Sequence, residues 1–211
     1  MRRPVKRVLP LAAGLLLLAS GCEGKDVPGT PALPAASASE PSPSAGESDV
    51  PAYGAPKVDN PLEVGDLVQR PCTALTDAQV TELLGSDTTE KEENVTGPAC
   101  SWHSYGSEGA FIAVGFPTVN DLGLTALYRG KGQQFQFFKE MPPVRGLPAV
   151  AWGQVDDTKT QGRCGVSIGI TDRSTMDATV TLSDKNIGKK DPCEATHDVL
   201  DMVVGNLQGG N

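Results

Sequence analysis

Alternating large and small side chains in the second half of the chain predict β-strands. Residues 163–171 carry valine or isoleucine at every second position from residue 166 on, and residues 177–183 repeat this alternation. A period of two turns one side of each strand toward a core. Together with the strand-like residues 149–154, these segments predict three neighbouring strands of an antiparallel meander.

Two further apolar segments predict a β-hairpin. Residues 99–103 and 110–116 are strand-like, and the turn-forming residues 106–109 separate them. The charged stretch at residues 90–93 is typical of a solvated loop, and residues 134–139 fit a helix or a strand equally well. The sheet is therefore expected to contain about five strands.

Capping residues mark a helix near each end of the expected domain. Thr76 is a good N-cap with Gln79 at the capping-box position, and it precedes an apolar stripe that ends at Gly85. Asp191 and Pro192 open a longer helix that keeps one face apolar for three to four turns, as far as Leu207. The pattern predicts an α+β fold, in which an N-terminal helix and a long C-terminal helix pack on an antiparallel sheet.

The beginning of the chain has the pattern of an export signal. Four basic residues precede the apolar residues 8–19, a run shorter than the about 20 residues that span a bilayer. Residues 18–22 (LASGC) resemble a bacterial lipobox, in which the cysteine sulfur receives a diacylglyceryl group. These features predict a signal peptide at residues 1–21 and lipidation of Cys22. An ordinary cleaved secretory signal is the alternative.

Composition divides the exported chain into a tether and a domain. Residues 22–60 are rich in proline, alanine, serine and glycine, so we expect a disordered tether. Residues 61–211 are long enough for a single domain. Removal of residues 1–21 lowers the net charge from −8 to about −12, which argues against a nucleic-acid partner. We therefore expect attachment to the outer face of the cell membrane through the lipid on Cys22.

Four cysteines remain in the expected domain, and an even number in an exported chain favours two disulfides. Of the three pairings that four cysteines allow, we favour Cys72 with Cys100 and Cys164 with Cys193. Each of these pairs encloses a compact segment with its own secondary structure. A zinc site is the competing interpretation, but the cysteines lack metal-binding spacing and both histidines are isolated. We expect no metal and no other cofactor.

Five short pieces of the chain carry a resemblance to a known family. They are Arg70-Pro71-Cys72-Thr73-Ala74-Leu75, Ala99-Cys100-Ser101-Trp102, Gly146-Leu147-Pro148-Ala149-Val150, Cys164-Gly165-Val166 and Asp191-Pro192-Cys193-Glu194. In these pieces the chain resembles the actinobacterial cell-envelope lipoproteins that are grouped as a domain of unknown function. The resemblance implies a lipobox, a Pro/Ser tether and a four-cysteine α+β domain, and it implies no activity.

One motif is shared with serine hydrolases. Residues 165–169 match Gly-x-Ser-x-Gly around Ser167, and His197 follows later in the chain, as in a hydrolase triad. The nucleophile of that motif needs a sharp strand-to-helix turn, whereas Ser167 lies inside an alternating strand pattern. We therefore expect that the protein is not an enzyme. An envelope serine hydrolase using Ser167 and His197 is the alternative.

The aromatic residues Phe135, Phe137 and Phe138 are the strongest indication of a binding surface. If they are exposed, they form an apolar patch for a ligand or partner, and the alternative is that they cover the sheet. With a lipid anchor and no catalytic constellation, the sequence predicts a non-catalytic envelope module that binds a small ligand or an envelope protein. A structural or assembly lipoprotein without a ligand is a further alternative.

Overall fold

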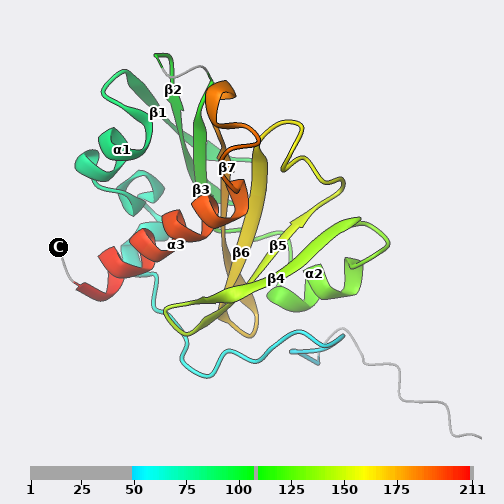
Figure 1. Ribbon diagram of the computed structural model, residues 1–211. Helices are drawn as coiled ribbons and strands as arrows, with labels where there is room; N and C mark the ends of the chain where they lie inside the picture. The colour runs from blue at the N-terminus through cyan, green and yellow to red at the C-terminus, as the bar shows by residue number, and fades with distance from the viewer. Residues whose placement is uncertain (1–48, 107–108, 210–211) are drawn as a thin grey trace, which may run out of the picture. The chain divides into compact units, whose positions relative to one another are not determined.

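The structure is a computed structural model that describes residues 49–106 and 109–209 (Figure 1). The expected signal peptide, the lipidation site at Cys22 and the expected tether up to residue 48 lie outside the described residues. All described residues belong to one compact unit.

Within the described residues, seven strands form one sheet, and all neighbouring strands are antiparallel. They are β1 (Thr88–Asn94), β2 (Pro98–Ser104), β3 (Phe111–Gly115), β4 (Phe137–Val144), β5 (Leu147–Gly153), β6 (Arg163–Thr171) and β7 (Ser174–Thr181). Their order across the sheet is β1-β2-β3-β7-β6-β5-β4 (Figure 1). The predicted hairpin is confirmed as β2 and β3, and the predicted meander is confirmed as β5, β6 and β7.

The sheet has two more strands than expected, and both lie at its edges. The sequence of β1 predicts a loop because its residues are polar or charged, yet all seven of them pair with β2. Strand β4 contains Pro142 and Pro143, and its register shifts between Met141 and Val144. An edge strand pairs on one side only, so it tolerates prolines and exposed charges. The expectation of about five strands is wrong for this reason.

Three α-helices and three 3₁₀ helices accompany the sheet in the described residues. They are α1 (Asp77–Leu84), α2 (Leu124–Gly130), α3 (Pro192–Gly209), η1 (Gly65–Val68), η2 (Pro71–Ala74) and η3 (Asp184–Asn186). Thr76 and Gln79 form the predicted capping box of α1, and Asp191 Oδ1 accepts a hydrogen bond from the Cys193 backbone N–H at 2.7 Å. Both predicted helices are confirmed. None of the described helices combines the length and the apolar character needed to cross a membrane.

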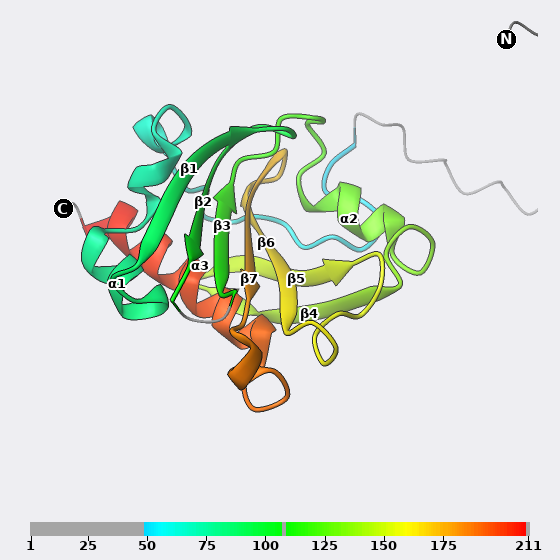
Figure 2. The same cartoon turned by 90° about the horizontal axis from the view of Figure 1, so that it is seen from above.

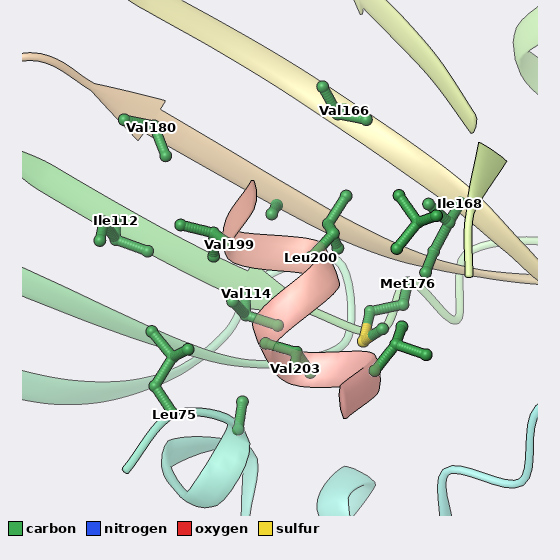
Figure 3. Close-up of a cluster of buried hydrophobic side chains, with 14 of the residues drawn as sticks. Leu75, Ile112, Val114, Val166, Ile168, Met176, Val180, Val199, Leu200 and Val203 are labelled. Carbon is green, nitrogen blue, oxygen red and sulfur yellow. The ribbon is translucent and has the colours of Figure 1, made fainter. Parts of the chain in front are cut away.

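Helix α3 packs on one face of the sheet and forms the main core (Figure 3). Side chains at even positions of β6 and β7 point toward this helix, and Val166, Ile168 and Met176 are fully buried there. They belong to the same core cluster as Val199 and Leu200 of α3. The alternation that predicted these strands therefore also selects the face that α3 covers.

The described residues contain two disulfides, and these join the same cysteines that were paired from the sequence. Cys72–Cys100 links η2 to β2, and Cys164–Cys193 links β6 to the first turn of α3. The Thr196 hydroxyl also donates a hydrogen bond to the Cys164 carbonyl oxygen at 3.1 Å. The start of α3 is therefore held to β6 by a covalent bond and by a buried hydrogen bond.

Residues before the expected domain boundary at residue 61 already contact the domain. Val58 is buried, and its backbone N–H donates a hydrogen bond to Asp172 Oδ1 at 2.8 Å. The backbone N–H of Ala52 donates to Thr125 Oγ1 of α2 at 3.0 Å. This part of the expected tether packs on the domain, because a buried valine and paired backbone groups offset the entropy of ordering it.

The double variant Cys164→Ala/Cys193→Ala is expected to lower the free energy of unfolding by about 3 to 4 kcal/mol, because the bond restricts the unfolded chain. Urea unfolding followed by circular dichroism measures the change. Val95→Ala is the control, since this side chain is 89% exposed, and it should change the value by less than about 0.5 kcal/mol. Equal effects of the two variants would contradict this role of the disulfide.

Candidate functional site

The sheet face opposite α3 carries a second, smaller apolar cluster. Leu124 and Leu127 of α2 pack there with Phe135 and with Val150 of β5. Figure 2 shows α2 and α3 on opposite sides of β6 and β7. The central strands therefore lie between two layers: the main core under α3 and the smaller cluster under α2.

A tight turn after α2 brings Phe135 back against the helix. The carbonyl oxygen of Gly130 accepts hydrogen bonds from the backbone N–H groups of Gln133, Gln134 and Phe135. A Cβ atom at Gly130 would lie 2.6 Å from the Phe135 ring, so the close approach requires glycine. The Phe135 ring meets Trp152 in a T-shaped contact with 4.8 Å between ring centroids. The turn thus places an aromatic pair beside α2.

A cleft of about 680 Å³ opens between α2, this turn and the neighbouring strands. Leu127, Phe135 and Trp152 contribute apolar lining, and Gln134 and Gln154 contribute side-chain amides. Binding pockets for small molecules typically measure about 300–1,000 Å³ and combine apolar walls with a few polar groups. The size and the lining of this cleft both fall within that description.

A short polar chain connects three strands beside the cleft. The Trp152 Nε1–H donates a hydrogen bond to Ser167 Oγ at 2.7 Å. Ser167 of β6 stands opposite Asp177 of β7 in the sheet register. Ser167 and Thr175 both form side-chain hydrogen bonds with the Asp177 carboxyl group. An indole, a hydroxyl and a carboxyl group are therefore linked across β5, β6 and β7.

The Asp177 carboxyl group lies in an unfavourable environment. Its Oδ1 atom is shielded from solvent and has no hydrogen-bond partner among the described residues. Burial raises the pKa of Asp177 from 3.8 to about 6, and the hydrogen bonds from Ser167 and Thr175 oppose this rise only in part. Buried, incompletely paired carboxyl groups beside a cleft are typical of functional sites. Asp177 is therefore the residue that best marks the candidate site.

The structure does not bring Ser167 and His197 together. Ser167 is fully buried on the α2 side of the sheet, where its hydroxyl accepts the hydrogen bond from Trp152. His197 belongs to α3 on the other side, and its Nε2 atom lies 3.1 Å from the Pro142 carbonyl oxygen. A serine nucleophile and its base must be within hydrogen-bond reach. The sheet between these two side chains prevents that contact.

The three phenylalanines do not form one exposed patch. Phe135 is buried at 7% exposure and lines the cleft. Phe137 and Phe138 are consecutive in β4, so they point to opposite faces: Phe137 packs against the main core and Phe138 against the α2 cluster. The alternative that these residues cover the sheet therefore describes Phe137 and Phe138, whereas Phe135 belongs to the candidate site.

One group of side chains in the described part of the chain has the spacing of metal ligands. It comprises Cys72, Glu90 and Cys100. The two cysteines are joined to each other, and Glu90 Oε2 accepts a hydrogen bond from Trp102 Nε1 at 2.9 Å. All three side chains are thus engaged by protein partners, and we assign no metal to them.

Sequence reasoning missed Asp177 and Trp152 as site residues. Trp152 ends an apolar run that predicts a core strand, and Asp177 begins the alternating segment at residues 177–183. The available signal was an acidic residue on the small-residue side of an alternating strand. This residue becomes a site candidate only when the register between β6 and β7 places Asp177 beside Ser167. The pattern of one strand does not predict its register with another strand.

Comparison with known proteins places the chain in a protein family. A family model described as "Protein of unknown function (DUF3558)" matches residues 17–206, a range that includes the whole sheet and most of α3. No curated protein and no solved structure gave a significant match.

Asp177→Asn is expected to stabilise the protein at high pH only. Asp177 binds its proton more tightly in the folded than in the unfolded chain, because folding raises its pKa from 3.8 to about 6. The resulting penalty is absent below the unfolded pKa, grows as pH rises and is complete above the folded pKa. Urea unfolding should show a gain of about 2 to 3 kcal/mol near pH 8 and almost no gain near pH 3.

Asp156→Asn is the matched control for this pH dependence. Hydrogen bonds from the Thr158 hydroxyl and backbone N–H lower the pKa of Asp156, so its ionised form is favoured by folding. This variant should lose stability, not gain it, at high pH. A gain for Asp177→Asn that is equal at both pH values would mean that ionisation of Asp177 is not the cause.

Proposed function

The chain belongs to the DUF3558 family of proteins of unknown function, and we propose that it is a non-catalytic module that binds a small ligand in the cleft beside α2. The observation that carries this proposal is Asp177, whose incompletely paired carboxyl group lies at a cleft of about 680 Å³. A polar group kept in such an environment weakens the fold, and a role in binding accounts for its presence.

Binding without catalysis is the function that the groups around the cleft support best. The Ser167 hydroxyl is buried beneath Trp152, which occupies its acceptor site. His197 lies on the opposite side of the sheet, so it is no base for Ser167. The aromatic pair of Phe135 and Trp152 instead supplies a rigid apolar surface, which is common in ligand sites.

We place this module on the outer face of the cell membrane, held by a lipid on Cys22. The basic and apolar start of the chain and the lipobox-like residues 18–22 support export and lipidation. The two disulfides also fit an oxidising compartment outside the cytoplasm. Two or three acyl chains would hold the protein without a basic patch, since each buried methylene contributes about 0.8 kcal/mol.

The variant Cys22→Ala tests the anchor. The wild-type chain, expressed in the cell that makes it, is expected to incorporate an alkyne-labelled palmitate and to sediment with membranes. Cys22→Ala should lose the label and leave the membrane fraction. Ser20→Ala is the control, because it retains the cysteine and a small residue before it. Membrane association of Cys22→Ala without label would contradict a lipid anchor at this position.

A ligand in the cleft can be detected by native mass spectrometry of the chain purified from its own envelope under non-reducing conditions. The wild-type chain should carry a non-covalent mass that Ala126→Phe lacks, because Ala126 is half-buried on α2 and its larger replacement would fill the cleft. Ala78→Phe makes the same change at an exposed position of α1 and should keep the mass. A bare wild-type chain would favour a structural lipoprotein instead.

A further inference from the structure

A second hollow, of about 210 Å³, adjoins the cleft on the same face of the sheet. Trp152 and Asp177 line both spaces, as do Thr96 and Pro117. The cleft beside α2 thus continues as a groove toward β3 and β2. The indole of Trp152 and the carboxyl group of Asp177 stand where the two parts meet.

Small side chains form the floor of this groove. In the sheet register Gly165, Thr179 and Ala113 follow one another across β6, β7 and β3, and Gly115 and Ala99 lie in the next row. All five are half-buried. From β5 to β2 the groove crosses four strand spacings, or roughly 19 Å. An occupant that fills both parts is therefore elongated and lies across the strands.

Gly165 has no reason within the protein to be glycine. A Cβ atom there would meet its nearest neighbours at 3.5 Å or more, which is ordinary contact, and its φ angle suits any residue. Gly169 on the same strand differs, since its Cβ would lie 2.9 Å from Val58. Glycine weakens a strand interior and often marks the close approach of a ligand. Because Gly165 has no side chain, the groove stays open beside Trp152.

The charges around the cleft favour a neutral occupant. Arg129 and Arg173 line the cleft together with Asp177, and Arg173 also pairs with Asp121 at 3.1 Å. A cationic molecule would approach the two arginines, and an anionic molecule would approach the Asp177 carboxyl group. A ligand of either charge would therefore meet a residue of the same charge somewhere in the cleft, whereas an uncharged ligand meets no repulsion.

The polar groups of the cleft favour a molecule with many hydroxyl groups. Four side-chain amides line it, from Asn120, Gln133, Gln134 and Gln154. Each amide offers both donors and an acceptor, as a hydroxyl group does, so the two pair in either direction. The flat indole of Trp152 complements the apolar C–H face of a sugar ring, which is the part of a sugar that amides leave unpaired.

Resting on the proposed function, we infer that the cleft and groove together bind a neutral oligosaccharide. One sugar ring lies against Trp152 near Asp177, and further rings extend over Gly165, Thr179 and Ala113 toward β2. The floor accommodates them because it lacks large side chains. The side-chain amides of the cleft then donate and accept the hydrogen bonds of the ring hydroxyls.

Two other elongated occupants fit the groove less well. An acyl chain needs an apolar enclosure, and this groove is open and contains the hydroxyl of Thr179 and the carboxyl group of Asp177. An extended peptide gains most of its affinity from unpaired backbone groups at a sheet edge. The groove lies on the face of inner strands, whose backbone groups already pair within the sheet.

The test uses three fractions prepared from the protein's own envelope: neutral oligosaccharides released by mild acid, a lipid extract, and peptides. Each fraction is passed over the immobilised full chain, and bound molecules are identified by mass spectrometry. We expect retention of neutral oligosaccharides longer than a disaccharide. Titration with the retained fraction should also change the fluorescence of Trp152, measured in the Trp102→Phe background because Trp102 lies in the core.

Gly165→Val is the deciding variant. It should weaken oligosaccharide binding at least tenfold while leaving the thermal midpoint of unfolding unchanged or higher, because valine suits a strand and its Cβ has room. Gly165→Ala should have an intermediate effect. Thr181→Val, on the same face of β7 but outside the groove lining, is the control and should bind like the wild-type chain.

Each outcome distinguishes this inference from the proposed function. Retained oligosaccharides that Gly165→Val loses support both. Retention of lipids or peptides that Gly165→Val loses would contradict an oligosaccharide ligand, and it would still support the proposed binding module. Oligosaccharide binding that is equal in Gly165→Val and Thr181→Val overturns the groove as its site. A folded wild-type chain that retains none of the three fractions overturns both proposals.

Discussion

The antiparallel pairing of β6 with β7 is the interaction on which both faces of the domain depend. Its register fixes which side chains meet α3 and which face the cleft, because neighbouring residues of a strand point to opposite faces. Val166 and Ala178 pair on the α3 side, and Ser167 and Asp177 pair on the other. A shift by one residue would place a carboxyl group in the main core, so the core and the cleft are specified together.

The two faces of the sheet contribute differently to stability. On one face, α3 buries Leu200 completely and is fastened by Cys164–Cys193. On the other face, Asp177 lacks a full set of partners and Gly165 adds no side chain to the packing. Because these weak points lie across the sheet from the main core, the domain retains them without losing its principal packing contacts.

The sequence predicts the inner parts of the fold well and the edges poorly. The helix caps at Thr76 and Asp191 depend only on neighbouring residues, and the alternation in the inner strands reflects burial of one strand face. The sequence therefore predicts both features correctly. Edge strands β1 and β4 lack that signal because water covers much of their surface. The candidate site is harder still, since Trp152, Ser167 and Asp177 meet only through strand pairing, and the patch expected from Phe135 contributes a single ring to it.

Both edges of the sheet resist pairing with a second copy of the chain. Along β1, Lys91 and Glu93 form an ion pair with 3.3 Å between Nζ and Oε1, and a strand added there would have to displace a hydrated row of charges. On β4, Pro142 and Pro143 offer no N–H groups for a new ladder. Strand addition is therefore disfavoured at both edges. A second copy of the domain would therefore gain few backbone hydrogen bonds by extending this sheet.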